Sequence, residues 1–182
     1  MTRALLTLAI LVGTSSIAVA GPFVGLGIGT SPATGGGIDF TQDGRSLRLF
    51  GGYQFPYRIT AEALVTRYGL VQEGGRIYDG TQLGLAGRYN HPIAEGFEAF
   101  GRLGMQHTSM TSTASNDSGA DASGKGVLLG VGIEYKIKIK FLASASVYFD
   151  YTIAAADLEG PSWGNVATMS TRHWTMGATV GF

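Results

Sequence analysis

The C-terminal end of the chain alternates between apolar residues and small or polar residues, and this pattern constrains the fold more than any other feature. The apolar positions are Trp174, Met176, Ala178, Val180 and Phe182. Successive side chains of a β-strand point to opposite faces, so the segment predicts a strand with one apolar face. An apolar strand face that ends in an aromatic residue, in a chain that begins with an export signal, is typical of a sheet that contacts lipid.

The first twenty residues have the pattern of an export signal. Arg3 supplies a positive charge, Ala4–Gly13 is apolar, and Ala18-Val19-Ala20 has the small-x-small form of a cleavage site. A membrane-anchor helix is the alternative, but the apolar segment is much shorter than the roughly 20 residues that such a helix needs. We therefore predict a signal peptide over residues 1–20 and one domain over residues 21–182.

Composition excludes several classes of protein. The chain has no cysteine, so it carries neither a lipid-modified cysteine nor a disulfide framework. Its net charge is zero, which gives no basic face for nucleic acid. The run Gly25-x-Gly27-x-Gly29 lacks the spacing and the following helix of a nucleotide-binding loop, and we expect no cofactor.

Apolar alternation recurs in eight segments of about ten residues, the length that a tilted membrane strand requires. They are 23–30, 45–55, 59–68, 80–90, 97–107, 126–136, 141–151 and 174–182. Lipid cannot satisfy an open sheet edge, so a closed barrel is the form that such strands can take in a membrane. The sequence therefore predicts an all-β fold, an eight-stranded antiparallel up-and-down transmembrane β-barrel.

The connections between these segments alternate between short and long. The short ones are 56–58, 91–96 and 137–140, of which the last contains no turn residue. In outer-membrane barrels the short turns face the periplasm and the long loops face outside. The predicted extracellular loops lie near 31–44, 69–79, 108–124 and 152–171.

The apolar faces carry no charge except Arg67, and most of them end in an aromatic residue. Aromatic rings prefer the headgroup level, so we predict an interfacial girdle. Its members at the periplasmic ends are Phe55, Tyr89, Phe97, Tyr135, Phe141 and Phe182, and those at the opposite ends are Tyr151 and Trp174.

The opposite faces of the strands collect charges among glycine, serine and alanine. These charges are Arg48, Glu62, Arg88, Glu98, Arg102, Glu134 and Asp150. The interior of an eight-stranded barrel is just wide enough for side chains, and buried charges must be paired. We predict a lumen largely plugged by paired charges; the alternative is that the same residues line a narrow, low-conductance pore. A soluble, lipocalin-like carrier would instead turn the apolar face inward, but glycines that share the charged face belong inside a tight barrel.

Two hairpin segments and the C-terminus resemble a known family. Gly51-Gly52-Tyr53-Gln54-Phe55 followed by Ile59-Thr60-Ala61-Glu62-Ala63 resembles the second and third strands of small OmpA-like outer-membrane β-barrels. The segment 130–136 and the terminal Gly181-Phe182 are similar to the sixth and eighth strands of that family. The resemblance implies an eight-stranded barrel whose C-terminal strand is recognised by the outer-membrane assembly machinery. It implies no enzymatic activity.

Two patterns suggest chemistry. His107-Thr108-Ser109 is similar to the His-x-Ser of PagL-type lipid A deacylases, although Met110 stands where that family has asparagine and no downstream glutamate is evident. Asn116, Asp117 and Asp121 could bind a hard cation, but the spacing of a dedicated calcium loop is absent. A polar strand end explains the first pattern just as well, and a solvated loop explains the second better than a cation site does. We therefore predict neither a catalytic site nor a metal site.

These observations predict a non-enzymatic protein of a Gram-negative outer membrane, with a structural or surface-interaction role. The expected partners are outer-membrane lipid and lipopolysaccharide, the assembly machinery through the strand that ends at Phe182, and an unidentified extracellular partner through the loops. A nucleic-acid partner is not expected. The alternatives are the narrow pore and the PagL-like deacylase.

Overall fold

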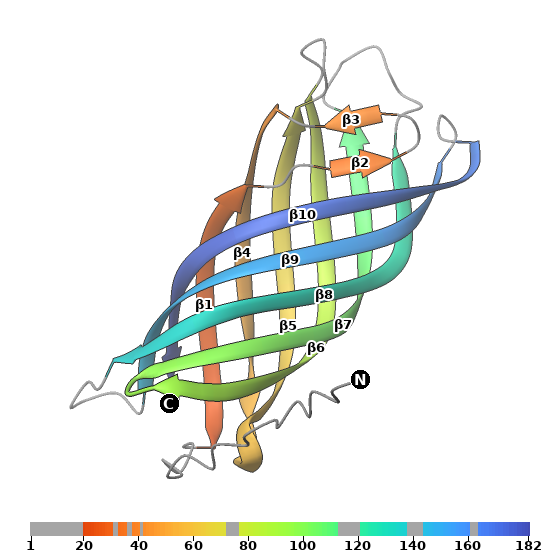
Figure 1. Cartoon of the computed structure of the whole chain (residues 1–182). Helices are drawn as coiled ribbons and strands as arrows, with labels where there is room; N and C mark the ends of the chain where they lie inside the picture. The colour runs from red at the N-terminus through yellow and green to blue at the C-terminus, as the bar shows by residue number, and fades with distance from the viewer. Residues whose placement is uncertain are drawn as a thin grey trace, which may run out of the picture.

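A computed structural model describes residues 20–30, 33–35, 38–40, 42–71, 77–112, 121–137, 144–160 and 164–182. These residues form strands almost throughout (Figure 1). Eight long strands make up the barrel: β1 (Gly21–Thr30), β4 (Gln42–Gln54), β5 (Ile59–Val71), β6 (Ile77–Ala94), β7 (Phe97–Ser112), β8 (Ala122–Ile137), β9 (Ser144–Gly160) and β10 (Gly164–Gly181). No helix in the described ranges is long and apolar enough to cross a membrane.

The sheet is antiparallel and closed. Each long strand pairs with the next along the chain, and β1 also pairs with β10, from Phe23 opposite Gly181 to Thr30 opposite Trp174. Closure leaves neither β1 nor β10 with an open edge over this length, which is what a lipid environment requires. The predicted eight-stranded up-and-down barrel is therefore confirmed.

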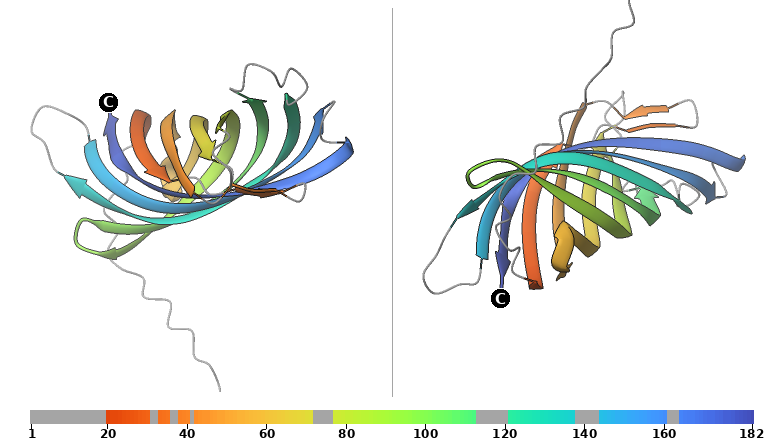
Figure 2. Two further views of the ribbon diagram at one scale, coloured as in Figure 1. Left: turned by 90° about the horizontal axis from the view of Figure 1, so that it is seen from above. Right: turned by 60° about the horizontal axis from the view of Figure 1, so that its bottom comes forward.

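The short connections gather at one end of the barrel. The 3-10 turn η1 (Pro56–Arg58) joins β4 to β5, and Glu95-Gly96 joins β6 to β7. Phe182 lies at this same end, which comes forward in the right-hand view of Figure 2. This is the predicted periplasmic end.

Several predicted boundaries were wrong. Residues 91–94 continue β6, so the turn before β7 is shorter than expected. At the opposite end the strands run well into the predicted loops: β9 reaches Gly160 and β10 begins at Gly164. The first predicted loop also contains a small hairpin, β2 (Ala33–Gly35) and β3 (Ile38–Phe40), which pairs with β10 (Figure 1). Outside the apolar belt both faces of a strand can be polar, so the alternation that marks a membrane strand is lost there although the pairing continues.

The two faces of each strand differ as the alternation predicts. Apolar side chains point outward, including Leu85 at 66% exposed and Met105 at 71%. The charged residues of the other face are buried: Arg48, Arg102 and Asp150 are 0–2% exposed. A soluble ligand carrier would need the reverse arrangement, so that alternative is excluded.

Interior glycines leave room for large side chains from other strands. A Cβ atom at Gly25 would overlap the ring of Phe50, and one at Gly27 would overlap the hydroxyl of Tyr148. Glycine is therefore required at these two positions of β1 for the lumen to pack.

Candidate functional site

The charged lumen is the most organised polar feature of the described structure. Six of its charges form one continuous series of ion pairs, and each comes from a different strand between β4 and β9. In order the series runs Arg48, Asp150, Arg102, Glu62, Arg88 and Glu134. Positive and negative charges alternate along it, so the series as a whole is neutral.

Two carboxylates each bridge two arginines. Asp150 Oδ2 accepts from Arg48 Nη1 and from Arg102 Nη1, each at 2.8 Å. Glu62 accepts from Arg102 Nε at 2.7 Å and from Arg88 Nη1 at 3.4 Å. These side chains are at most 4% exposed, so the pairs lie in a low-dielectric environment where loss of one partner would leave a charge uncompensated.

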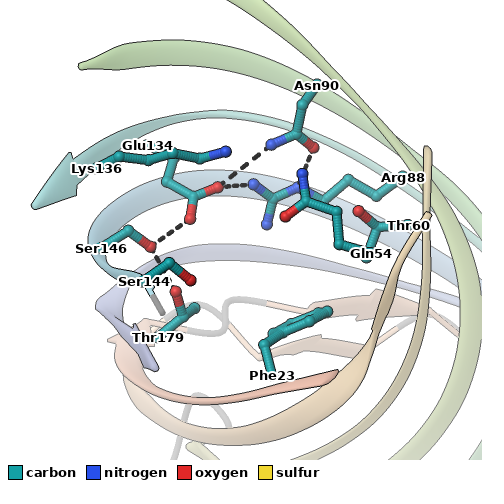
Figure 3. Close-up of a pocket in the computed structure, with 10 residues that line it drawn as sticks. All are labelled: Phe23, Gln54, Thr60, Arg88, Asn90, Glu134, Lys136, Ser144, Ser146 and Thr179. Atoms are coloured by element: carbon teal, nitrogen blue, oxygen red, sulfur yellow. Dashed lines mark hydrogen bonds and ion pairs between the residues drawn. The ribbon is translucent and has the colours of Figure 1, made fainter. Parts of the chain in front are cut away.

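The series ends in a small polar cluster at the short-turn end of the barrel (Figure 3). Glu134 pairs with Arg88 and accepts from Ser146, while Asn90 joins Arg88 to Glu98. Lys136 Nζ lies 2.9 Å from Glu98 and neutralises it. A cavity of about 30 Å³ lies among these groups, enough for about one water molecule.

All seven predicted lumen charges face the interior, but Glu98 does not join the series directly. Lys136, the cation that pairs with Glu98, is not among the predicted lumen residues. The parity of the alternation could have found it, since Glu134 and Lys136 share a face.

Large apolar side chains also fill the lumen, and the sequence reasoning did not assign Phe50, Leu64, Phe100 and Leu128 to it. One cluster lies among the charges and contains Phe50, Leu64, Ala86, Phe100, Leu128, Tyr148 and Ala154. The guanidinium carbon of Arg88 lies 3.8 Å from the centre of the Phe100 ring, a cation–π contact. These residues occupy the face of the strand that also carries the charges, and a pattern of apolar against polar positions does not single them out.

A second apolar cluster lies at the opposite end of the lumen. It consists of Tyr68, Tyr78, Met110, Ala122, Ala156, Leu158 and Met169, none more than 4% exposed. Between this cluster and the ion pairs lie buried polar side chains such as Gln82, Gln106 and His173. The Nε2 atom of His173 is 2.9 Å from Thr171 Oγ1. This end of the described interior contains no ion pair.

The described members of the predicted girdle lie on the outer surface. Phe97 opposes Tyr135 with ring centroids 4.6 Å apart, and Tyr151 opposes Trp174 at 4.3 Å. Phe55, Tyr89 and Phe182 are also exposed. Phe141 lies outside the described residues.

His107 and Ser109 share the outer face of β7, near its extracellular end, and both are exposed. Their cross-strand neighbours carry no carboxylate: Leu83 and Lys125 oppose His107, and Thr81 and Ser123 oppose Ser109. On the adjacent strand β6, Asp79 opposes Thr111, four residues from His107, and pairs with Arg67. Asp157 and Glu159 lie one strand further away on β9. The described structure therefore supplies no acid beside His107 to orient it as a general base.

The three residues that were considered as cation ligands are only partly described. Asn116 and Asp117 lie outside the described residues, and Asp121 is exposed just before β8. Among the described residues no group of three or more histidine or acidic side chains could hold a metal ion.

Comparison with known proteins identifies the family. A model of the outer membrane protein beta-barrel domain matches residues 4–182. The chain belongs to this family of outer-membrane β-barrels. The OmpA-like resemblance and the predicted outer-membrane class are thereby confirmed, and the short-turn end of the barrel is the periplasmic end. A search of curated proteins finds no significant match.

Solved structures of other outer-membrane barrels share the fold. Neisserial surface protein A has a TM-score of 0.68 and 15% identity, over 88% of this chain and 97% of that one. Ail of Yersinia pestis has a TM-score of 0.57 and 17% identity, over 89% and 99%. The N-terminal barrel of Pseudomonas aeruginosa OprF has a TM-score of 0.52 and 14% identity, over 90% and 99%. At these identities the likeness extends to the fold alone.

Proposed function

We propose that this protein is a non-enzymatic outer-membrane barrel whose lumen is closed and whose extracellular end makes its contacts. The observation that carries the proposal is the neutral series of ion pairs from Arg48 to Glu134, which joins six strands across the lumen. A conducting path needs charges that water and ions can reach, whereas these are paired and almost fully buried. Apolar side chains fill the space between and above them.

The test combines conductance and enzymology on one preparation. The folded chain is inserted into planar bilayers for single-channel recording and assayed in parallel for release of acyl chains from lipid A. Folding is verified by heat-modifiable mobility on gels. The proposal predicts no discrete conductance and no deacylation; either activity in the wild-type protein would overturn it.

A narrow pore is the second candidate, and one observation favours it. Several buried polar atoms make no hydrogen bond within the described part of the chain, among them Tyr148 Oη, Asp150 Oδ1 and Thr175 Oγ1. Such atoms are commonly satisfied by internal water, which would give the lumen some hydration. If the lumen conducts, Glu62→Gln and Arg102→Met should change the unitary conductance, whereas Arg67→Gln on the outer wall should not.

The deacylase hypothesis is weaker because the neighbours of His107 include a lysine and no carboxylate. It makes a distinct prediction all the same. Any lipid A hydrolysis should disappear in both His107→Ala and Ser109→Ala while conductance stays unchanged.

Lipopolysaccharide is a proposed partner of the outer wall. Just beyond the apolar belt, on the extracellular side, lie the exposed basic residues Arg45, Arg67, Lys125 and Arg172. Guanidinium and ammonium groups at this level suit the phosphates of outer-leaflet lipid. For Ail, a structure in complex with the heparin analogue sucrose octasulfate exists; by analogy we extend the proposal to an extracellular partner bound at the loop end of this barrel.

Two further parts of the proposal concern biogenesis. Residues 1–20 act as a cleaved export signal, and the C-terminal strand that ends at Phe182 is recognised by the barrel assembly machinery. The N-terminal sequence of protein purified from outer membranes tests the first. Phe182→Ala, which should lower the amount of folded protein in the membrane, tests the second.

A further inference from the structure

Two glycines on the outer wall differ from those inside the barrel. Gly87 of β6 and Gly101 of β7 point toward lipid, as their neighbours Leu85 and Leu103 do. A Cβ at Gly101 would meet nothing within 4 Å, and one at Gly87 would meet only the Leu103 carbonyl oxygen at 4.0 Å. Glycine weakens a strand, and packing does not explain why it occupies these two positions.

The missing side chains leave a groove in the apolar belt. Gly87 opposes Leu103 and Gly101 opposes Tyr89, so the two glycines are diagonal neighbours and form one floor. Ile59, Tyr89, Leu103 and Val131 stand around this floor, and the shallow, open groove above it has a volume of about 500 Å³.

The position of the groove indicates which part of the membrane fills it. Tyr89, at its edge, lies near the periplasmic end of the apolar face, where Phe97 and Tyr135 mark the headgroup level. Two nitrogen-bearing side chains that can donate hydrogen bonds lie just beyond: exposed His91 on β6, and Arg58 in η1, which packs beside β6. A lipid with a phosphate at that level would have its first methylene groups at Gly101 and Gly87.

We propose that this groove binds one acyl chain of a glycerophospholipid from the periplasmic leaflet, with the phosphate near Arg58 and His91. The site depends on the barrel being inserted in a membrane and not on the role proposed for its loops. A flexible linear chain fits a depression only one or two residues wide, and the bulky residues around it would hold that chain in place longer than its neighbours in the bilayer.

Filling the groove tests the proposal. The wild-type chain, Gly101→Leu and Gly87→Leu/Gly101→Leu are folded into vesicles of phosphatidylethanolamine and phosphatidylglycerol and extracted in mild detergent. Retained phospholipid per barrel is counted by native mass spectrometry. The matched control is Ala178→Leu, which adds the same side chain to an exposed, lipid-facing position on β10.

We expect Gly101→Leu and Gly87→Leu/Gly101→Leu to lower the amount of retained phospholipid about twofold or more, because the leucine side chains occupy the space of the acyl chain. Ala178→Leu should retain the wild-type amount. Arg58→Gln/His91→Gln should lower retention less than Gly101→Leu does. Equal retention in all variants, an equal loss in the control, or a change of oligomeric state without a change in lipid would each overturn the proposal.

A second measurement serves if the leucine variants do not fold. Phospholipid with a photoreactive group in its acyl chain is cross-linked to wild-type protein and to Gly101→Ala, and the labelled peptides are mapped. Labels concentrated on β6, β7 and β8 near Tyr89 and Leu103 support the site. An even distribution around the barrel would overturn it.

Discussion

The periplasmic and extracellular halves of the lumen fill similar spaces with different chemistry. Near the periplasmic end, arginines and carboxylates pair in a defined order, and each bridging group has two partners. Near the extracellular end, Tyr68, Met110, Leu158 and Met169 pack without an ion pair among the described residues. Removing one member of a buried ion pair leaves the other charge uncompensated, which costs much stability in a single step. An apolar cluster instead loses stability in proportion to the volume removed.

The largest effect should come from Arg102, which contacts both bridging carboxylates. Arg102→Met leaves Glu62 and Asp150 each short of one partner in a buried site, at a cost of about 3–5 kcal/mol in the free energy of unfolding. Urea unfolding of vesicle-inserted protein, followed by gel mobility, measures this. The control Arg67→Gln breaks an exposed pair with Asp79 and should change little. A loss no greater than that of the control would mean that the network contributes nothing net.

The apolar half should respond next. Leu158→Ala removes a side chain that is 0% exposed in the extracellular cluster and should cost about 2–5 kcal/mol, by lost burial and the cavity left behind. The same unfolding assay applies. The ion pairs stay intact, so conductance should equal that of the wild type; if Leu158→Ala alone opens a channel, the apolar cluster, and not the ion pairs, closes the barrel.

The third prediction compares the inner wall with the outer wall by one substitution. Gly27→Val would overlap Tyr148 and Thr175 and should destabilise by about 1–3 kcal/mol. Gly101→Val enters open space on the lipid side and should stay within about 0.5 kcal/mol of the wild type. Similar losses of stability in Gly27→Val and Gly101→Val would show that the space around each glycine does not determine the effect of the substitution.

The smallest effect is expected at Lys136. Its side chain is 30% exposed and its pair with Glu98 lies at the edge of the lumen, so solvent screens the attraction. Lys136→Gln should cost about 0.2–1 kcal/mol, less at high salt. If Lys136→Gln lowers the free energy of unfolding as much as Arg102→Met does, the pair of Lys136 and Glu98 behaves as part of the buried network.

The sequence predicted the barrel and the direction of its charges because both depend on a period of two. Arg48, Glu62 and Arg102 could be assigned to the interior from parity alone, and the strand order follows from short and long connections. The partners of each charge could not be assigned, because Arg48 and Asp150 are far apart in the chain and meet only across a closed lumen.

Apolar alternation gave misleading information in two places. Phe50, Leu64 and Leu128 face inward among polar residues, where a search for apolar outer faces does not look for them. Beyond the membrane the strands near Gly160 and Gly164 continue to pair although their sequences no longer alternate. Backbone pairing needs no apolar face, so hydropathy could not locate these strand ends.

The bond between Arg48 and Asp150 has a consequence for the order of assembly. These residues lie on β4 and β9, the strands that flank β1 and β10, where the sheet closes. In an unclosed sheet Asp150 could already reach Arg102 on β7, but β4 and β9 would lie near opposite ends of the sheet. If β1 and β10 are the last strands to pair, Arg48 reaches Asp150 only when the sheet closes, and closure completes the series of ion pairs.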